Sequence, residues 1–423
     1  MPVDRSRVRF YHQLFHEYFA AHKLRHELSK GHDLRLYWPS EHWWKASGWE
    51  ETIIILAGLV SNVSSFLEKL TPINPILASH CLLDAGVQAT EATKHGIITD
   101  LIVRMTDVKE SPQARPLAGR ALARLGDPRG GVGLSEDGLP DILWCEIPAG
   151  PFMRGSNDYV TERGRLARYY GDERPQQEVY LSDYRISRFP ITNSQYNAFV
   201  RDDGYQKIDY WRAAAKAGYW KDGKVKIIFY SDEELSERWD DRPPDYYGFP
   251  YHLLNHPIVG ITWYEAVAFC SWLTVRLRQK EVLNEDEVIG LPTENQWEKA
   301  ARGPATSRRV YPWGNTPNPN HANFSETGIG TTTAVGCFPN GASPYGVEDM
   351  AGNVWEWCQT RFHASYDSYY LDENDNEKVE KRVVRGGSFS YDKDKICCSV
   401  RSWYFPFTRY LEQGFRITLS KLL

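Results

Sequence analysis

The sequence predicts an α+β protein in which an all-helical N-terminal domain precedes an irregular, loop-rich domain. Three observations lead to this fold class. Apolar residues recur at helical spacing from about Arg9 to Arg124, a stretch rich in Gly, Asp and Pro follows from Gly126 to Pro140, and the periodicity is poor after it. Pro, Gly, Trp and Asn are spread through this last part, which is typical of short strands joined by long loops. We therefore expect a helical domain at 1–130, a linker at 131–142 and a second domain at 143–423.

The helical part contains three segments that can be read as helices. The first has six apolar residues near helical spacing: Phe10, Leu14, Phe15, Tyr18, Phe19 and Leu24. The second, Trp49 to Leu70, is apolar enough to be a buried helix. The third, Gln113 to Leu125, has small residues at close spacing, which suits tight pairing of helices, and Gly126-Asp127-Pro128 ends it.

Three helices are predicted in the loop-rich domain, and each begins at a threonine. They run from Thr192 to Val200, from Thr262 to Arg278 and from Thr293 to Arg302. In the second and third, a Glu or Gln stands three residues after the threonine, which is the pattern of a capping box. Residues 205–255 form a polar insertion rich in Trp and Tyr, which we interpret as a lid or as a contact to the helical part.

Composition and charge argue against several classes of protein. The net charge of −5 is not that of a general nucleic-acid binder, whose affinity comes from a basic surface. The longest apolar run, Ile53 to Val60, is too short to cross a membrane, and the charged start, Met1 to Phe10, lacks the apolar core of a signal peptide. The seven cysteines form no CxxC pair, so we expect reduced thiols in a cytoplasmic protein.

A series of short motifs, in order along the second domain, carries a family resemblance. The motifs are Ile147-Pro148-Ala149-Gly150, Glu173-Arg174-Pro175, Pro190-Ile191-Thr192, Leu291-Pro292-Thr293-Glu294-Asn295-Gln296-Trp297, Tyr311-Pro312-Trp313-Gly314, Gly352-Asn353-Val354-Trp355-Glu356-Trp357, Arg385-Gly386-Gly387-Ser388 and Gly414-Phe415-Arg416. By these motifs the domain resembles the formylglycine-generating enzyme, or sulfatase-modifying factor, family. The resemblance implies an irregular α+β fold related to that of C-type lectins.

The chain lacks the cysteines that this family uses for catalysis. By position, the two thiols that bind copper in the family fall on Tyr391 and Ile396. A soft Cu(I) ion needs sulfur ligands, which a phenol and an alkyl group cannot replace, so we expect no copper and no catalytic residue. Cys397 and Cys398 stand next to the second position, but neighbours on an extended strand point to opposite sides. We interpret both as small buried apolar groups.

A second branch of the resembled family binds non-heme iron through three histidines, with His-x-x-x-His-x-Glu spacing. This chain has His12-x-x-x-His16-Glu17 and His22-x-x-x-His26-Glu27. The i, i+4 spacing puts two imidazoles on one helix face, but the Glu falls one place early in both segments. We interpret these side chains as partly exposed helical histidines. A metal-dependent oxidase with altered ligands is the alternative function.

The resemblance also implies a structural Ca²⁺ ion in the loop that carries the Gly-Asn-x-Trp-Glu-Trp motif. The matching positions are Asp349, Gly352, Val354 and Glu356. Two carboxylates and two backbone carbonyls are hard oxygen ligands, as Ca²⁺ requires. The alternative is that the two carboxylates only cap N–H groups of their own loop.

The C-terminal segment is unusually aromatic. Five of the eight residues from Trp403 to Tyr410 are aromatic, where members of the family usually have polar residues on the floor of their pocket. Exposed aromatic residues usually mark a binding face. We expect ligand contacts from Tyr391, Asp392, Val400, Ser402, Trp403, Tyr404, Phe405, Phe407, Thr408, Tyr410, Leu411 and Glu412. The alternative is that these aromatics pack on residues 131–181 or on the helical part.

This layout is also similar to that of the variable proteins of diversity-generating retroelements. Their varied segment begins near Arg-Gly-Gly-Ser and ends near Gly-Phe-Arg, close to the C-terminus, so the resemblance implies a diversified segment here. Two features depart from the pattern. Cys398-Ser399-Val400 stands where Arg-Ser-Ala is usual, and several residues are harder to obtain from Asn codons: Lys393, Lys395, Trp403, Glu412 and Gln413.

The helical part resembles the region that follows the nucleotide-binding module of NACHT-type NTPases. The segments Phe10 to Ala21 and Trp49 to Leu59 carry this likeness, and Leu117 to Arg129 is similar to one HEAT repeat. The sequence has no G-x-x-x-x-G-K-[ST] loop for a nucleotide. We expect non-catalytic recognition of a protein or small-molecule ligand at the C-terminal face, linked to an NTPase signalling or defence module, without nucleic acid or membrane as partner.

Overall fold

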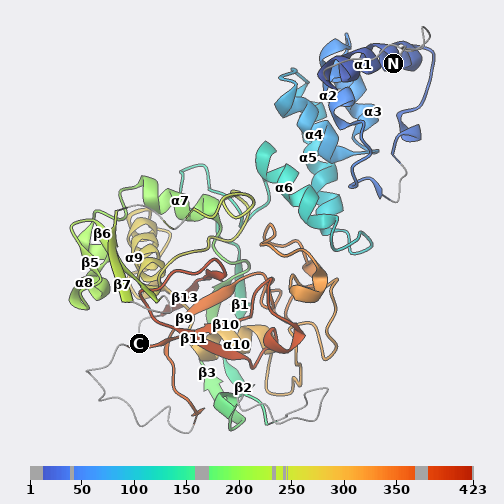
Figure 1. Cartoon of the computed structure of the whole chain (residues 1–423). Helices are drawn as coiled ribbons and strands as arrows, with labels where there is room; N and C mark the ends of the chain where they lie inside the picture. Colours follow the sequence, from blue (N-terminus) through green and yellow to red (C-terminus); the bar gives the residue numbers. More distant parts are fainter. Residues whose placement is uncertain are drawn as a thin grey trace. The chain divides into compact units, whose positions relative to one another are not determined.

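The computed structural model describes residues 13–38, 42–157, 171–230, 235–241, 244, 246–366 and 380–421. The chain forms two compact units, Met1–Asp127 and Pro128–Leu423 (Figure 1). The first unit is helical and the second mixes helices and sheets, so the predicted α+β class is confirmed. None of the described helices is both long and apolar enough to span a bilayer.

The segment expected as a linker is packed into the second unit. The N–H of Gly131 donates to Asp141 Oδ2 at 2.8 Å, and Val132 is buried. The side-chain amide of Gln195 donates to the carbonyls of Gly131 and Asp141 at 3.1 and 2.7 Å. The division between the units therefore falls at Asp127, before the predicted linker.

The first unit is a set of helices that pack on one another. Its elements are α1 (Gln13–Ser29), η1 (Leu34–Leu36), α2 (Glu50–Leu59), α3 (Val63–Leu70), α4 (Pro75–Asp84), α5 (Glu91–Thr106) and α6 (Arg115–Leu125). Helix α1 contacts α2, α5 contacts α6, and α4 contacts both α2 and α6. Ala118, Gly119 and Ala121 of α6 are buried, in keeping with the tight pairing that their small side chains predict.

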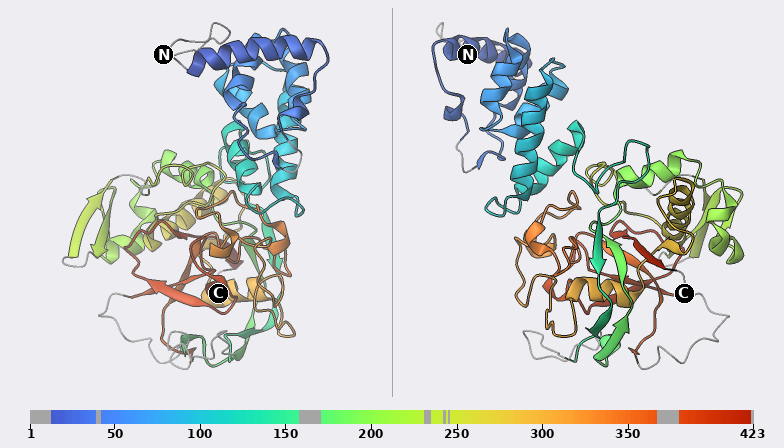
Figure 2. Two further views of the ribbon diagram at one scale, coloured as in Figure 1. Left: turned by 45° about the vertical axis from the view of Figure 1, so that its right-hand side comes forward. Right: turned by 180° about the vertical axis from the view of Figure 1, so that it is seen from behind.

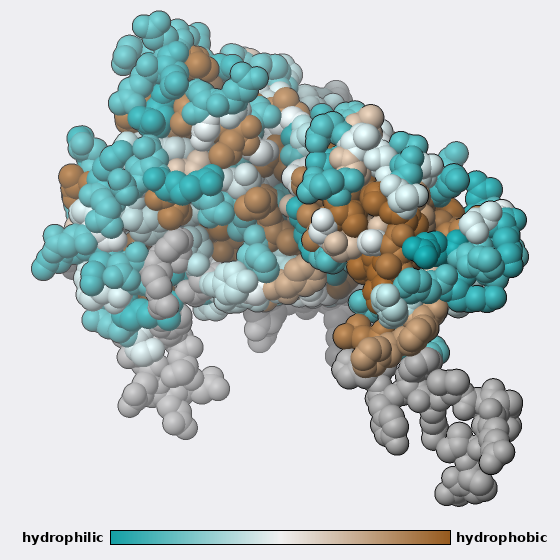
Figure 3. All heavy atoms as spheres, turned by 90° about the horizontal axis from the view of Figure 1, so that it is seen from above, coloured by the Kyte–Doolittle hydropathy of each residue, from teal (hydrophilic) through white to brown (hydrophobic). Residues whose placement is uncertain are grey.

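Two predictions for the first unit need correction. The apolar stretch from Trp49 to Leu70 is broken into α2 and α3, because the side chain of Asn62 accepts from the Ser65 N–H and begins a new helix. On α1, Ala21 and Leu24 are buried, but four of the six apolar residues that recur near helical spacing are exposed: Leu14, Phe15, Tyr18 and Phe19. Phe10 lies outside the described residues. Figure 3 shows hydrophobic residues among polar ones on the face of the molecule drawn there.

The second unit is built around two four-stranded sheets. The first sheet has the order β1-β4-β13-β8 and consists of β1 (Trp144–Ile147), β4 (Tyr184–Ser187), β13 (Thr418–Lys421) and β8 (Glu287–Gly290). The second has the order β11-β10-β9-β12 and consists of β11 (Arg401–Tyr404), β10 (Arg382–Arg385), β9 (Trp355–Arg361) and β12 (Gln413–Gly414). Strand β12 runs parallel to β9, and the other neighbours are antiparallel.

Two smaller β structures complete the second unit (Figure 2). One is the hairpin of β2 (Gly150–Arg154) and β3 (Gln177–Leu181). The other is the sheet of β5 (Trp220–Lys221), β6 (Lys224–Tyr230) and β7 (Leu235–Asp240). This second sheet lies in the insertion 205–255, which we expected to be a lid or a contact. Tyr205, Trp211 and Trp220 are buried in the main core, so this part of the insertion belongs to the domain.

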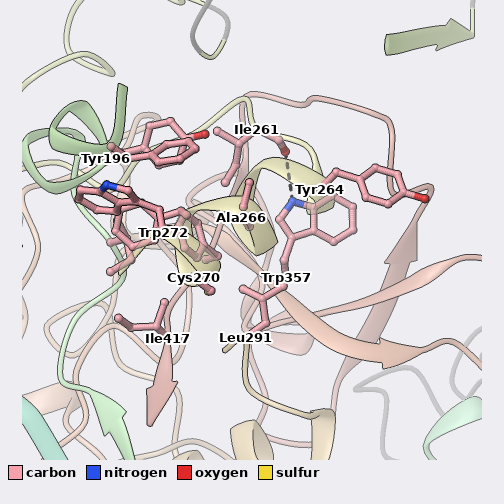
Figure 4. Close-up of a cluster of buried hydrophobic side chains, with 14 of the residues drawn as sticks. Tyr196, Ile261, Tyr264, Ala266, Cys270, Trp272, Leu291, Trp357 and Ile417 are labelled. Carbon is pink, nitrogen blue, oxygen red and sulfur yellow. Dashed lines mark hydrogen bonds between the residues drawn. The ribbon is translucent and has the colours of Figure 1, made fainter. Parts of the chain in front are cut away.

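The described helices of the second unit are α7 (Asn193–Arg201), α8 (Arg212–Lys216), α9 (Trp263–Gln279) and α10 (Glu294–Arg302). Helices α7, α9 and α10 begin where their threonine caps predict, and the short helix α8 was not predicted. Thr192, Thr262 and Thr293 each form a complete capping box with the residue three positions on. Helix α9 lies in the largest core, where Ala266 and Trp272 pack near Tyr196 and Trp357 (Figure 4).

Candidate functional site

The two faces of the β11-β10-β9-β12 sheet have opposite character. In antiparallel pairs, residues directly opposite each other share a face. Arg401, Arg385 and Glu356 are in register and form one face. Ser402, Val384 and Trp357 form the other, to which Trp355 and its register partner Gln413 also belong. We call these the charged face and the aromatic face.

On the charged face, each buried guanidinium meets a carboxylate. Arg401 donates to both oxygens of Glu294, at 2.7 and 2.8 Å. Arg385 donates to Glu298, whose other oxygen accepts from Arg302 at 2.9 Å. Glu294 and Glu298 come from helix α10, which covers this face. These charges are paired and removed from water, so the face is a structural network.

The predicted calcium ligands lie beside this network. Both oxygens of Glu356 accept from Arg416, at 2.6 and 2.8 Å, and one also accepts from the indole of Trp297. Asp349 accepts from the N–H of Gly336 at 2.8 Å, and burial raises the pKa of its carboxyl to about 7. The carboxylate of Glu356 is thus held by a cation and does not fit the role of a calcium ligand. Calcium at Asp349 and at the carbonyls of Gly352 and Val354 stays a prediction.

On the aromatic face, three tyrosines gather over Trp355 and Trp357. The ring of Tyr391 stands edge-on to Trp355 with centroids 5.4 Å apart, and Tyr404 stands edge-on to Trp357 at 6.2 Å. Tyr404 also contacts Tyr410 at 5.0 Å. Burial and the hydrogen-bonded neighbour Tyr391 raise the pKa of the Tyr404 phenol. We call Tyr391, Tyr404 and Tyr410 the tyrosine cluster.

Two buried polar side chains beside this cluster lack hydrogen-bond partners. Among the described residues, the indole N–H of Trp355 and both polar atoms of the Gln413 amide have none. Gln413 is 0% exposed and Trp355 is 2% exposed. The indole of Trp357, by contrast, donates to the carbonyl of Ile261 at 3.1 Å (Figure 4). Neither Gln413 nor Trp355 was predicted to contact a ligand, because the lack of a hydrogen-bond partner is visible only in three dimensions.

The two positions matched to the family's copper-binding thiols have no sulfur atom, and the neighbouring cysteines do not replace it. Tyr391 belongs to the tyrosine cluster, and Ile396 is fully buried. Cys398 is also buried, and burial raises the pKa of its thiol to about 12. The pKa of Cys397 is likewise raised by burial. All seven cysteines are free, and these two hold their protons at neutral pH, so the residues present do not fit copper.

The predicted aromatic segment divides between two environments. Trp403 carries the ammonium of Lys381 over its ring, with Nζ 3.3 Å from the centroid, and contacts Phe405. Phe405 stacks on Phe407 at 5.3 Å, and Phe407 stacks on Tyr219 at 5.0 Å. Tyr219 belongs to the insertion 205–255. These rings, which we call the aromatic ladder, pack on one another and on the insertion, not on residues 131–181 as the packing alternative stated.

Several predicted ligand contacts are core residues. Val400, Phe407 and Thr408 are 3%, 2% and 3% exposed, so the expectation that they face solvent is wrong. The remaining predicted positions reach the surface at least in part: Tyr391, Asp392, Ser402, Trp403, Tyr404, Phe405, Tyr410, Leu411 and Glu412. A run of aromatics cannot reveal this division, because Val400, Phe407 and Thr408 lie outside strand β11 and no strand alternation marks them as buried.

The edge of the tyrosine cluster adds polar groups and further aromatic residues. The hydroxyl of Ser390 donates to the carboxylate of Glu412, and the backbone carbonyl of Glu412 accepts from the backbone N–H of Trp355 at 2.8 Å. The N–H of Gly260 donates to the carbonyls of Tyr410 and Gln413, both at 3.1 Å. Gly260 has a φ of +68°, and the ring of Tyr247 occupies the space that a Cβ would need there. The loop 246–252 therefore borders the cluster.

The histidines of α1 form no metal site in the described part of the chain. Within these ranges, no three His, Cys, Asp or Glu side chains come together as metal ligands. The ring of His22 contacts Tyr18 at 4.5 Å, and Glu17 accepts from the hydroxyl of Thr52. His12 lies outside the described residues.

Comparison with known proteins agrees with the motifs. The sulfatase-modifying factor enzyme 1-like domain matches residues 139–421. Over 313 residues the chain is 31% identical to hercynine oxygenase of Mycolicibacterium thermoresistibile, covering 70% of this chain but 63% of that protein, less than two thirds of its length. It is 30% identical over 327 residues to the formylglycine-generating enzyme of Thermomonospora curvata, covering 65% of this chain and 93% of the enzyme. Among solved structures, Treponema denticola variable protein 1 aligns with a TM-score of 0.43 and 20% identity, over 65% of this chain and 94% of the other.

Proposed function

Because the chain belongs to the sulfatase-modifying factor family, we propose that its second unit is a non-catalytic member that recognises a ligand at the tyrosine cluster. The observation that carries the proposal is the tyrosine at position 391. At the position where members of the family have a metal-binding thiol, this chain has a phenol that packs on Trp355 and lies in one cluster with Tyr404 and Tyr410. The position matched to the metal-binding thiol is thus part of an aromatic surface.

The aromatic surface has the composition of a recognition site. Tyrosine offers a large contact area at a small cost in side-chain entropy, and its hydroxyl adds a polar group. Tyr410 is exposed, Tyr391 and Tyr404 are half-buried, and the polar pair Ser390 and Glu412 lies beside them. The aromatic ladder is less suited to this role, because Phe407 is buried and the ring of Trp403 is already covered by the ammonium of Lys381.

Two further parts of the proposal rest on the sequence. The segment that carries Tyr391 to Glu412 is similar in position to the varied segment of retroelement proteins. A near-copy of its coding sequence beside a reverse transcriptase gene would support diversification. Coupling of the helical unit to an NTPase module is proposed from the NACHT-like segments and stays a prediction, as does a cytoplasmic location.

A metal titration tests the non-catalytic part of the proposal. We expect the purified chain to bind no Cu(I) at a stoichiometric level, whereas the variant Tyr391→Cys with Ile396→Cys binds about one equivalent, since two thiols are restored at the matched positions. A redox-active metal at near-stoichiometric level in the purified wild-type chain would overturn the proposal and favour the alternative, a metal-dependent oxidase with altered ligands.

A binding experiment tests the recognition part. Uracil, benzoate and benzamidine represent neutral, anionic and cationic planar molecules, and ligand-observed NMR detects weak binding of each. We expect at least one to bind the wild-type chain, to lose binding in Tyr404→Ala and to keep it in Trp403→Ala, with unchanged circular dichroism. If none of the three binds, or if both variants bind alike, recognition at the tyrosine cluster is wrong.

A further inference from the structure

Trp355 and Gln413 differ from the other buried tryptophans of the second unit and from its buried Gln195. The other buried indoles there donate to a partner, namely Trp211, Trp220, Trp263, Trp272, Trp297 and Trp357. The buried amide of Gln195 donates twice and accepts once. An unmet buried polar group costs about 1–3 kcal/mol, so two such side chains side by side call for an explanation.

The two side chains form one hydrogen-bonding edge. Gln413 and Trp355 are register partners on parallel strands, so both project from the aromatic face. Together they supply two donors, the indole N–H and the amide NH₂, and one acceptor, the amide oxygen. The complement of this edge is a ligand with a carbonyl oxygen next to an N–H.

The surroundings restrict the charge and the shape of that ligand. The carboxylate of Glu412 accepts from Ser390 at the edge of the cluster and acts on Tyr404, and its negative charge disfavours an anionic ligand. The rings of Tyr391, Tyr404 and Trp357 border the edge, and flat aromatic walls favour a flat ligand.

We propose that the ligand of the tyrosine cluster is a small, uncharged, planar heterocycle with an amide edge, of the lactam or imide type found in nucleobases, held by Gln413 and Trp355. This assignment rests on the proposed function, since it names the ligand class of the same site. The Gln413 amide pairs with the N–H and C=O of the ligand, and the Trp355 N–H donates to a ligand carbonyl. Tyr410, the most exposed ring of the cluster, turns aside to admit it.

Matched probes and matched variants test the assignment. Uracil has the amide edge, and 1,3-dimethyluracil has the same ring and carbonyls without an N–H. We expect uracil to bind the full chain at least roughly tenfold more tightly than the dimethyl compound, the effect of one lost hydrogen bond. Trp355→Phe keeps an aromatic ring without the N–H, Gln413→Leu keeps the size of the side chain, and each weakens uracil binding by roughly tenfold. Trp403→Ala, in the aromatic ladder, leaves uracil binding unchanged.

The outcomes separate this inference from the proposed function. If uracil and 1,3-dimethyluracil bind equally, or if Gln413→Leu and Trp355→Phe bind uracil like wild type, the amide-edge assignment is wrong. If uracil fails while benzoate or benzamidine binds in a Tyr404-dependent manner, the assignment is wrong and the proposed function stands. If no probe binds, both are wrong.

Discussion

The charged and aromatic faces of one sheet differ in whether their buried polar side chains have a partner. On the charged face, Arg385 and Arg401 meet carboxylates of α10. On the aromatic face, the side chains of Trp355 and Gln413 are as deeply buried but have no partner among the described residues. The family motifs carry most of the charged face, and its network serves the fold. The polar groups without a partner lie one residue away along the same strands, and a ligand could supply their missing hydrogen bonds.

The largest effect expected from this comparison is on the charged face. Glu298→Ala leaves Arg385 and Arg302 buried without their shared carboxylate, and the free energy of unfolding should fall by about 3–5 kcal/mol. Chemical denaturation followed by tryptophan fluorescence measures it. The control is Arg212→Ala, which removes an exposed pair with Asp209 and should cost less than about 1 kcal/mol. Equal losses in both variants would show that the network contributes no more than a surface pair.

A second prediction concerns a carboxyl next to the charged face. Burial raises the pKa of Glu173 from 4.5 to about 7, although Ser399 and Arg385 act in the opposite direction. A carboxyl with a higher pKa in the folded chain binds its proton more tightly there, so folding stability falls as the pH rises from about 4.5 to about 7. The loss amounts to about 3 kcal/mol.

Glu173→Gln should remove this dependence and raise stability at pH 8 relative to wild type. Glu287→Gln is the control with the opposite sign. Hydrogen bonds from Asn284 and the neighbouring Arg185 lower the pKa of Glu287, so its ionised form stabilises the fold and the variant loses stability at pH 8. Unfolding curves at pH 5 and pH 8 measure both. A Glu173→Gln variant that is no more stable than wild type at pH 8 would place an unseen partner beside the carboxylate.

The third prediction tests whether the buried polar groups without hydrogen-bond partners lower the stability of the free protein. Gln413→Leu keeps the size of the side chain and removes both polar atoms, so it should stabilise the free protein by about 1–2 kcal/mol. Gln195→Leu, which loses a capping box and two carbonyl contacts, should instead destabilise it by about 1–3 kcal/mol. Thermal melts of the two variants measure both changes. A loss of stability in Gln413→Leu would mean that the amide is already satisfied.

The smallest expected effect is that of calcium. Because Glu356 is held by Arg416, we expect Ca²⁺ to raise the melting temperature little, if at all. The measurement compares melts with added Ca²⁺ and with chelator, for wild type and for Asp349→Asn, which suits the left-handed backbone there (φ +54°). A rise of several degrees that Asp349→Asn abolishes would instead confirm the calcium site predicted from the sequence.

What could be predicted from the sequence was local. The threonine caps of α7, α9 and α10 depend on residues three apart, and they placed all three helix starts. The apolar stretch from Trp49 to Leu70 was taken as one helix because apolarity outweighed Asn62, a cap in its middle. The order of the motifs was sufficient to identify the family, because identifying it requires no knowledge of contacts between residues.

The site could be predicted only in outline, because its character depends on residues far apart in the chain. Arg401 meets Glu294 across 107 positions, and Phe407 stacks on Tyr219 of the insertion. No local pattern distinguishes Phe407, which is buried, from Tyr410, which is exposed. Gln413 precedes a family motif and gave no signal of its own, because an unmet hydrogen bond is a property of its neighbours.

The division of the aromatic segment also bears on how such a surface could evolve. If the stretch after Arg385-Gly386-Gly387-Ser388 is rewritten by a retroelement, Val400, Phe407 and Thr408 offer little freedom, because any new side chain there must fit the core. Variants that replace them would mostly be lost as unfolded chains before selection for binding acts. The useful repertoire is then concentrated at the tyrosine cluster, where new side chains change the surface and leave the fold intact.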